Sequence, residues 1–260
     1  MNILTFASWL SDMAPAWMLS LPEGLQRFCF QVFQTFVYEN RWKFFTDGLS
    51  ITFIVTIGAL ILGVIIGMIV ALIRSTHDSV RGKPNFILRI LNGICKIYVT
   101  VLRGTPLMVQ LLIMGFVVMV PKSSFQTVLC AVVTLGINSG AYVAEIARSG
   151  IMSISAGQTE AGRSLGLNYF QTMLYIVLPQ AFKNILPALG NELIALLKET
   201  SLVTTIALQD ITKAAQVIVS KTYTPVIPYI SLAAIYLILV MALTKLLGIL
   251  ERRLRESDKR

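Results

Sequence analysis

The sequence predicts an all-α integral membrane protein, and three observations support this prediction. Of the 260 residues, 55% are hydrophobic and only 13% are charged, whereas a soluble domain normally carries about 25% charged residues. The mean hydropathy is +0.74. Four windows contain no Asp, Glu, Lys or Arg, and each is near the ~20 residues that cross a bilayer as a helix. These windows are 48–73, 104–121, 123–144 and 222–244.

The net charge of +9 comes from 22 Lys and Arg against 13 Asp and Glu. In a soluble protein such an excess would suggest a polyanion such as nucleic acid as partner. In a membrane protein the same excess is expected, because basic loops face the cytoplasm and the anionic inner leaflet. We therefore expect the lipid bilayer, and no nucleic acid, as the partner of these charges.

Residues 1–46 precede the first charge-free window and form a separate, aromatic-rich segment. Several glutamines and charged residues make it too polar to span a membrane. Its apolar residues instead fall on one helical face, which is typical of a helix lying in the membrane interface. This face comprises Phe28, Val32, Phe33, Phe36 and Val37. The alternative is an irregular external cap.

A fifth span is hidden by polar residues between positions 186 and 208. Lys198 and Glu199 lie within this otherwise apolar stretch. A charge at the centre of a bilayer costs roughly 2.5–3.5 kcal/mol on insertion scales, so both side chains must face protein or water. The span is therefore either lined by polar surroundings or broken.

Orientation follows from the distribution of Lys and Arg in a five-span model. One set of loops holds twelve basic residues and the opposite set holds six, which places the N-terminus outside and the C-terminus in the cytoplasm. The expected organisation is an external segment 1–46, a five-span domain 47–250 and a basic cytoplasmic tail 251–260. The longest internal loop, 149–187, is then cytoplasmic.

That loop carries start and stop signals for two short helices. The signals are Ser155 and Gln158 at the first start, Gly166 after its end at Leu165, Asn168 and Gln171 at the second start, and Pro179 at the second end. Ser155 and Gln158 have the spacing of a capping box, and glycine accepts the positive φ that commonly ends a helix. Two helices joined at a glycine would form a rigid knob for a groove on another protein. An ordinary amphipathic connector is the alternative.

The residues of this loop resemble a known sequence element. Glu160-Ala161-Gly162, then Gly166, then residues 176–179 (Ile-Val-Leu-Pro) are similar to the EAA loop of permease subunits in binding-protein-dependent ABC importers. Only Gly162 departs from the pattern, in which alanine is commonest at that position. Other segments resemble the permeases for polar amino acids, namely Arg103–Leu107 with Gln110, Gly140–Tyr142 with Glu145, Leu178–Ala181 and Leu197–Leu202. The resemblance covers about residues 46–250.

The resemblance implies the five-helix fold of type I ABC importer permeases in a bacterial cytoplasmic membrane. It also implies a second permease subunit, two cytoplasmic ATPase subunits that bind ATP and Mg²⁺, and an external solute-binding protein. This chain contains no GxxxxGK[ST] phosphate-binding motif, so we expect a non-catalytic subunit without a cofactor of its own. The residues implied in contact with the ATPase are Glu160, Ala161, Gly162, Leu165, Gly166 and Leu167.

The polar residues within the spans suggest a path for the solute. A free amino acid carries a carboxylate and an ammonium, so a transient site needs a cation, an anion and neutral hydrogen-bonding groups. The candidates are Arg103, Gln110, Asn138, Tyr142, Glu145, Lys198, Glu199, Thr200 and Ser201. Arg103 would hold the carboxylate, with Gln110 two helical turns further along the same face unless Pro106 kinks the helix between them. For Lys198 and Glu199 we favour a helix-breaking or gating role.

Three alternatives remain open at this stage. Arg103 and Glu145 could form a structural ion pair between two spans instead of lining a path. An ATP-independent secondary transporter or channel would also account for the spans and their charges. A membrane-embedded enzyme is a weaker hypothesis, because the sequence has no HExxH motif, no nucleophile elbow and only one histidine. The sequence does not distinguish glutamine, histidine, arginine, glutamate, cystine and opines as solutes, nor identical from homologous permease partners.

Overall fold

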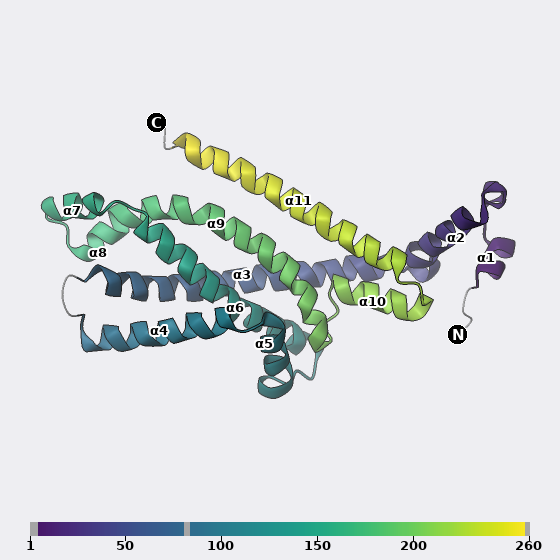
Figure 1. The fold of residues 1–260 in the computed structure, drawn as a ribbon, viewed down its shortest axis with the longest axis horizontal. Coiled ribbons are helices and arrows are strands. Elements are labelled where there is room, and N and C mark those ends of the chain that lie inside the picture. Colours follow the sequence, from purple (N-terminus) through teal and green to yellow (C-terminus); the bar gives the residue numbers. More distant parts are fainter. Residues whose placement is uncertain (1–4, 81–83, 258–260) are drawn as a thin grey trace. The chain divides into compact units, whose positions relative to one another are not determined.

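The computed structural model describes residues 5–80 and 84–257, and every regular element within this part of the chain is helical (Figure 1). The α-helices are α1 (Phe6–Asp12), α2 (Glu23–Val32), α3 (Trp42–Ser79), α4 (Phe86–Gly104), α5 (Leu107–Ile113), α6 (Ser124–Met152), α7 (Ala156–Ser164), α8 (Tyr169–Thr172), α9 (Leu178–Glu199), α10 (Ile211–Thr222) and α11 (Val226–Ser257). Three π-helical turns, Phe33–Val37, Met114–Val118 and Met173–Val177, follow α2, α5 and α8. The prediction of an all-α protein is confirmed for the described residues.

Three helices in the described ranges are long and apolar enough to cross a membrane: α3, α6 and α11. Two bent pairs raise the number to five if each pair is one span, namely α4 with Leu107–Val118, and Tyr169–Ile206 with α10. The apolar window of α6 is 61% buried, whereas that of α11 is 11% buried. Helix α6 is therefore enclosed by protein, and α11 presents most of its surface outward.

The second charge-free window, 104–121, does not form a single straight helix. The chain instead builds α4 before this window, and α5 leaves α4 at an angle of 105°. Pro106 precedes α5, and its ring disfavours helical backbone at Thr105, which is extended with ψ of 145°. Arg89, Lys96 and Arg103, expected in loops or at span edges, lie within α4.

One compact unit contains the chain up to Ile51 together with Gln209–Leu237. Its apolar core comprises Phe45, Ile211, Ala214, Ala215 and Ile218, with Phe36, Phe44, Leu49, Leu232, Ile235 and Tyr236 packed against them. Gly48 permits the closest approach in this unit, because a Cβ there would lie 2.7 Å from the backbone oxygen of Asp210. The start of α3 and α10 are thereby held in backbone contact.

The N-terminal segment of this unit is helical, but its exposed face differs from the predicted one. Phe28 and Val37 are exposed, while Val32, Phe33 and Phe36 are half-buried. The α2 helix gives way to a π-helical turn at Phe33, so the later residues do not follow the 3.6-residue period on which the prediction depended.

The other compact unit contains Thr52–Leu208 and Ile238 onward. Helices α3 and α6 pack closely through small residues, since a Cβ on Gly63 would lie 2.9 Å from Ser139 Oγ and one on Gly136 would lie 2.8 Å from Leu62 Cδ2. Helix α4 joins them through a cluster of Val70, Cys95, Val99, Ala141 and Ala144. A second cluster joins α3, α6 and α9 through Ala71, Ala147, Ile151, Val177, Ala181 and Ile185.

Helix α9 differs from the prediction at its start, whereas its other end agrees with the predicted break near Lys198 and Glu199. Pro179 does not end a helix, because the chain continues from the π-helical turn Met173–Val177 into α9, where Pro179 lies in the first turn. A proline in a first turn lacks an N–H that would have no helical partner there. At the other end the α-helix stops at Glu199 and passes into a 3₁₀ segment, Thr200–Ile206. Ala207 closes this segment with a φ of 61°.

Candidate functional site

Helices α7 and α8 form a tight corner beside the end of α3 (Figure 1). Ser155 caps α7 by accepting a hydrogen bond from the Gly157 N–H, although Gln158 turns toward Gln180 and does not complete the predicted capping box. Asn168 and Gln171 form the predicted second start as a complete capping box. These local signals fix the two helix starts.

Gly166 ends α7 in the left-handed conformation that we expected, with a φ of 82°. The Leu167 N–H donates to the Gly162 carbonyl and the Gly166 N–H donates to the Arg163 carbonyl. This pair of bonds is the Schellman motif, which satisfies carbonyls at a helix C-terminus. The corner between α7 and α8 is therefore fixed by backbone hydrogen bonds.

Gly162, the one departure from the EAA pattern, is buried at the contact between α7 and the π-helical turn after α8. A Cβ at this position would lie 2.8 Å from Ile176 Cδ1 and 2.9 Å from Thr172 Cγ2. The absence of a side chain lets the two segments approach closely. In this chain the glycine belongs to the packing of the corner.

The outer surface of this corner is apolar. Leu165 is 81% exposed, Phe170 is 72% exposed and Tyr175 is 67% exposed. Glu160 and Ala161 lie on the exposed part of α7, and Leu167 is half-buried. Large apolar groups gathered in a polar loop usually indicate an interaction surface. We name this outer surface the corner patch: Ala161, Leu165, Phe170 and Tyr175.

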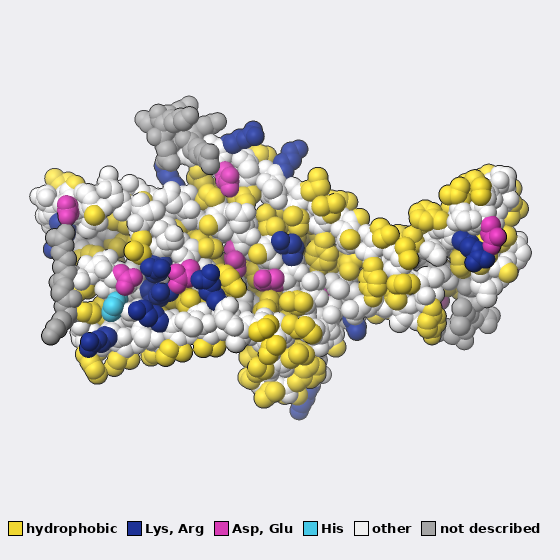
Figure 2. Space-filling model, viewed as in Figure 1, with side chains coloured by type: hydrophobic (Ala, Val, Ile, Leu, Met, Phe, Trp, Pro, Cys, Tyr) yellow, Lys and Arg dark blue, Asp and Glu magenta, His cyan; other side chains and the backbone are white. Residues whose placement is uncertain are grey.

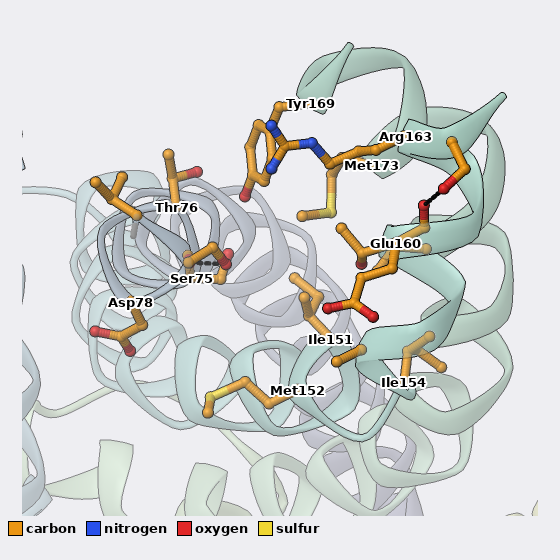
Figure 3. A pocket seen from close by; sticks show the side chains of 16 residues that line it. Ser75, Thr76, Asp78, Ile151, Met152, Ile154, Glu160, Arg163, Tyr169 and Met173 are labelled. Atoms are coloured by element: carbon orange, nitrogen blue, oxygen red, sulfur yellow. Dashed lines mark hydrogen bonds between the residues drawn. The ribbon is translucent and has the colours of Figure 1, made fainter. Parts of the chain in front are cut away.

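A cavity of about 910 Å³ lies behind the corner, between α7, α8 and the ends of α3 and α6. Ser75, Thr76 and Asp78 come from α3, and Glu160, Arg163 and Tyr169 line it from the corner (Figure 3). Both charge types and several hydroxyls line the cavity together with apolar side chains such as Ile151, Met152 and Met173, so its lining is mixed.

A second group of polar residues closes the bend between α4 and α5. Gln110 Nε2 donates to the Leu102 carbonyl at 2.9 Å and to Thr105 Oγ1 at 2.8 Å. Asn138 Nδ2, from α6, donates to Gln110 Oε1 at 2.9 Å and to the Leu102 carbonyl at 3.2 Å. Gln110 therefore folds back onto the end of α4, and it does not continue the face of Arg103 as we expected. The break at Pro106 causes this difference.

Arg103 lies at the end of α4, with its guanidinium carbon 4.9 Å from the centre of the Tyr142 ring. A cavity of about 430 Å³ beside it is lined by Arg74, Lys96, Val99, Thr100, Arg103 and Glu145. Three cations and one carboxylate therefore surround this space. The sequence-predicted residues Arg103, Tyr142 and Glu145 are brought to one region.

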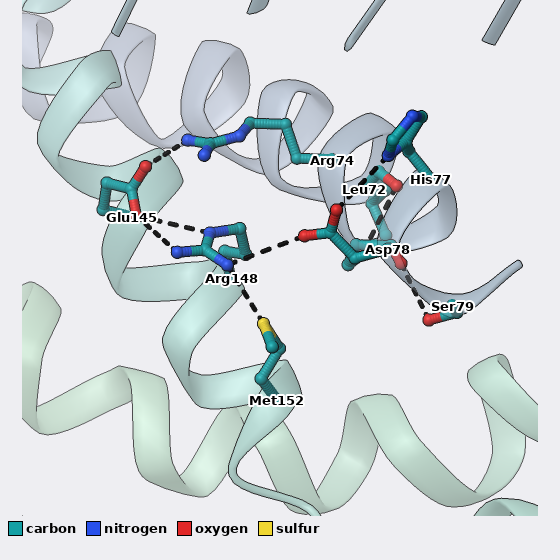
Figure 4. Close-up of polar contacts among 9 residues, drawn as sticks. Leu72, Arg74, His77, Asp78, Ser79, Glu145, Arg148 and Met152 are labelled. Carbon is teal, nitrogen blue, oxygen red and sulfur yellow. Dashed lines mark hydrogen bonds and ion pairs between the residues drawn. The ribbon is translucent and has the colours of Figure 1, made fainter. Parts of the chain in front are cut away.

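Glu145 is engaged by other cations than the one suggested by the sequence. Its carboxylate accepts from Arg74 of α3 and, at 3.1 Å, from Arg148 Nη2 (Figure 4). Arg148 also reaches Asp78 at 3.6 Å. Figure 2 shows acidic and basic side chains gathered in one band beside the single histidine. Within the described ranges Arg103 forms no ion pair, so the Arg103–Glu145 pair is excluded there.

One buried acid was not among the sequence-predicted site residues. Glu192 of α9 is 9% exposed, and its carboxylate accepts a hydrogen bond of 2.6 Å from Ser139 Oγ of α6. Ser139 is next to Asn138 and three residues before Tyr142, so Glu192 belongs to the same region. The signal was present in the sequence, because Glu192 is an acid within the fifth predicted span.

The remaining predicted residues lie at the end of α9. Lys198 is exposed and Glu199 is half-buried in its last turn, where the α-helix becomes 3₁₀. Thr200 is fully buried, and its hydroxyl donates a hydrogen bond of 2.7 Å to the Leu197 carbonyl. Ser201 is half-buried. These four residues line the transition between two helix types.

Comparison with known proteins identifies the family of the chain. The family model of the inner membrane component of binding-protein-dependent transport systems matches residues 63–256. The chain belongs to this family. The sequence resemblance to ABC importer permeases is thereby confirmed, and the protein is a permease of the bacterial inner membrane.

Curated relatives of this permease cover most of the chain. The arginine transport system permease protein ArtQ of Bacillus subtilis (strain 168) is 38% identical over 216 residues, which are 83% of this chain and 94% of that protein. The glutamine transport system permease protein GlnP of Escherichia coli (strain K12) is 33% identical over 211 residues, 80% of this chain and 92% of that protein. In the crystal structure of an amino acid ABC transporter with histidines, one chain is 41% identical with a TM-score of 0.72. That match covers 81% of this permease and 94% of that chain.

Proposed function

We propose that this permease is the membrane-spanning subunit of an ATP-driven importer for a polar amino acid. The relatives named for arginine and glutamine transport support the class of solute. The chain lacks a phosphate-binding motif, so two separate cytoplasmic ATPase subunits would bind ATP and Mg²⁺. A second permease subunit and an external solute-binding protein would complete the importer.

The proposed topology has five spans, with residues 1–46 outside, 47–250 as the membrane domain and 251–260 in the cytoplasm. The asymmetry of basic residues favours this orientation. Single cysteines at Thr76 and Ser123, in a chain without its own cysteines, test it. We expect an impermeant thiol reagent added outside to label position 123 and to leave position 76 unlabelled. Labelling of position 123 only from the cytoplasmic side would contradict the topology.

The corner patch is the observation that carries this proposal. Its apolar side chains are exposed on two short helices that backbone hydrogen bonds hold at a fixed angle. We propose that it inserts into a groove of the ATPase, with Glu160, Ala161 and Leu165 in contact and with Gly162, Gly166 and Leu167 shaping the corner. Closure of the ATPases would then move the corner and α9 together, since the chain runs from α8 into α9 without a loop.

The solute path is proposed to pass the polar group around α6. Arg103 offers a cation to the solute carboxylate, and the buried Glu192 offers an anion to its ammonium. Gln110, Asn138 and Tyr142 supply neutral groups between these two charges. Glu145 would line the path without binding the solute, because Arg74 and Arg148 already neutralise its carboxylate. Lys198, Glu199, Thr200 and Ser201 would gate the path where the α-helix ends.

Reconstitution tests the function directly. The permease, its ATPase and its solute-binding protein are placed in vesicles, and uptake of radiolabelled amino acids is measured with ATP, with ATP and vanadate, and without nucleotide. We expect concentrative uptake only when ATP hydrolysis and the binding protein are both present. Uptake that follows an ion gradient without ATP would instead favour a secondary transporter, and equilibration without either would favour a channel.

A further inference from the structure

Three segments near the N-terminus expose large apolar side chains. Met13, Trp17, Leu19, Leu25 and Phe28 are each at least half exposed, and they lie at the end of α1, in the following 3₁₀ turn and on the first turns of α2. We name this set the N-terminal patch. The family model begins only at residue 63, so the patch lies outside the part of the chain that defines the permease family.

The patch rests on an ordered base. Trp9 is 1% exposed and packs against Phe6, Phe30 and Phe33 with ring centres 5.3–6.2 Å apart. Arg27 stacks on Phe6 at 5.4 Å and pairs with Glu23. Burying one set of aromatic rings while exposing another gives this small segment an inner and an outer apolar face. The outer face has no cover within the described chain.

The base is fixed to the start of α3. Arg41 is 5% exposed, and its guanidinium donates to the Gln34 carbonyl at 2.9 Å, pairs with Glu39 at 3.2 Å and stacks on Tyr38 at 5.0 Å. Trp42 follows Val37 by only five positions, so the segment cannot move more than about 18 Å from the first turn of α3. Trp42 is exposed there, and Lys43 lies over its ring.

A tryptophan and a lysine at the start of a membrane-spanning helix mark the level of the lipid head groups. The N-terminal patch is tethered at that level. Its charges also balance, since Asp12, Glu23 and Glu39 offset Arg27, Arg41 and Lys43. A neutral, aromatic and methionine-containing surface suits the boundary between head groups and acyl chains, and it requires no anionic lipid.

We infer that the N-terminal patch is a membrane anchor that inserts Trp17 and its apolar neighbours into the lipid interface around the start of α3. The inference needs the chain to be a membrane protein and does not depend on its coupling to an ATPase. With the proposed orientation the lipid would be that of the outer leaflet. Docking of the solute-binding protein on the same patch is the competing outcome.

The chain offers a direct probe, because its three tryptophans are Trp9, Trp17 and Trp42. The variant Trp9→Phe/Trp42→Phe leaves Trp17 as the reporter, and Trp17→Phe/Trp42→Phe leaves the buried Trp9 as the matched control. Each full-length variant is reconstituted into neutral phosphatidylcholine vesicles with or without bromine on the acyl chains. We expect brominated lipid to quench Trp17 more than Trp9, and aqueous iodide to leave Trp17 unquenched.

Strong quenching of Trp17 by iodide with none by brominated lipid would overturn the anchor. Shielding of Trp17 from iodide that occurs only after the solute-binding protein is added would also overturn it, in favour of protein docking. Trp9→Phe could disturb the aromatic base, and a second comparison avoids this substitution. The quenching by brominated lipid is measured for the unaltered chain and for Trp17→Phe alone, and the difference between them reports on Trp17. Transport activity is not a readout here, so failure of the importer proposal would leave this test interpretable.

Discussion

The corner patch exposes apolar side chains, whereas the interior around α6 buries polar ones. At the corner, Leu165 and Phe170 are exposed on short helices of a polar loop. In the interior, Asn138 and Glu192 are buried among apolar spans. A patch of exposed apolar groups marks a surface that another molecule can cover, whereas a buried polar group needs hydrogen bonds or a ligand. On the proposed function the ATPase covers the corner patch, while Asn138 and Glu192 of the interior already have hydrogen-bond partners within the chain.

The comparison implies separable phenotypes. Substitutions in the corner patch should change assembly with the ATPase and leave the isolated subunit stable. Substitutions in the interior divide further, because Arg103 has no ion pair in the described chain while Glu145 has two. The following variants test these divisions, beginning with the largest expected effect.

Arg103→Gln should reduce ATP-driven uptake by about tenfold or more, since a hydrogen bond to a charged group contributes about 1.5–3 kcal/mol. Arg103→Lys should give an uptake between those of the unaltered chain and Arg103→Gln, because lysine keeps the charge but loses the two-pronged geometry of the guanidinium. Uptake and the melting temperature in detergent are measured together. The melting temperature should not change, as Arg103 is exposed; a parallel loss of stability and uptake would assign Arg103 a structural role.

Leu165→Asp should weaken association with the ATPase by about tenfold, because burial of a leucine contributes about 1.5–3 kcal/mol. Leu165→Met keeps an apolar side chain and serves as the control with near-normal association. The measurement is co-purification of the ATPase together with ATPase stimulation in vesicles. Unchanged binding of the Leu165→Asp subunit would remove the corner patch as the docking surface.

Arg74→Gln should lower the stability of the subunit by about 1–3 kcal/mol, because Glu145 loses one of its two cations. Glu145→Gln should have a similar effect, and the double variant should lose less than the sum. The control is Arg103→Gln combined with Glu145→Gln, for which we expect additivity. Coupling between positions 103 and 145, with none between 74 and 145, would contradict the observed pairing.

Gly162→Ala and Gly157→Ala form the mildest test. Alanine in place of glycine normally stabilises a helix by about 1 kcal/mol. At Gly157 the nearest atom to an added Cβ is Ser155 Oγ at 3.5 Å, an ordinary contact, whereas at Gly162 two side chains lie within 3.0 Å. We expect hydrogen exchange of α7 to slow for Gly157→Ala and to stay the same or quicken for Gly162→Ala. Equal slowing would mean that the corner has room for the usual alanine.

The sequence predicts best what short-range chemistry controls. Ser155, Gly166 and the Asn168–Gln171 box act within a few residues, and the helix boundaries that they predict are observed. The charge-free windows likewise locate α3, α6 and α11, because apolar length is a local property. Membership of the permease family also follows from local motifs.

The sequence does not predict features that depend on contacts between residues far apart in the chain. Helix α4 was missed because Arg89, Lys96 and Arg103 interrupt its apolar pattern, and only the fold supplies polar space beside Lys96 and Arg103. The pairing of Glu145 with Arg103, left open as an alternative, is not observed, and its actual partner Arg74 is 71 positions away in the chain. Glu192 and Ser139 are 53 positions apart. No spacing rule connects such residues before the helices are packed.

The π-helical turn Met173–Val177 determines which way the corner patch faces. A π turn holds about one residue more than the α turn that it replaces, and each residue of an α-helix advances the azimuth by about 100°. The corner is therefore rotated about the axis of α9, compared with its position on an unbroken α-helix. Deleting one residue from the π turn would turn the exposed side chains of α7 and α8 in another direction without changing their chemistry.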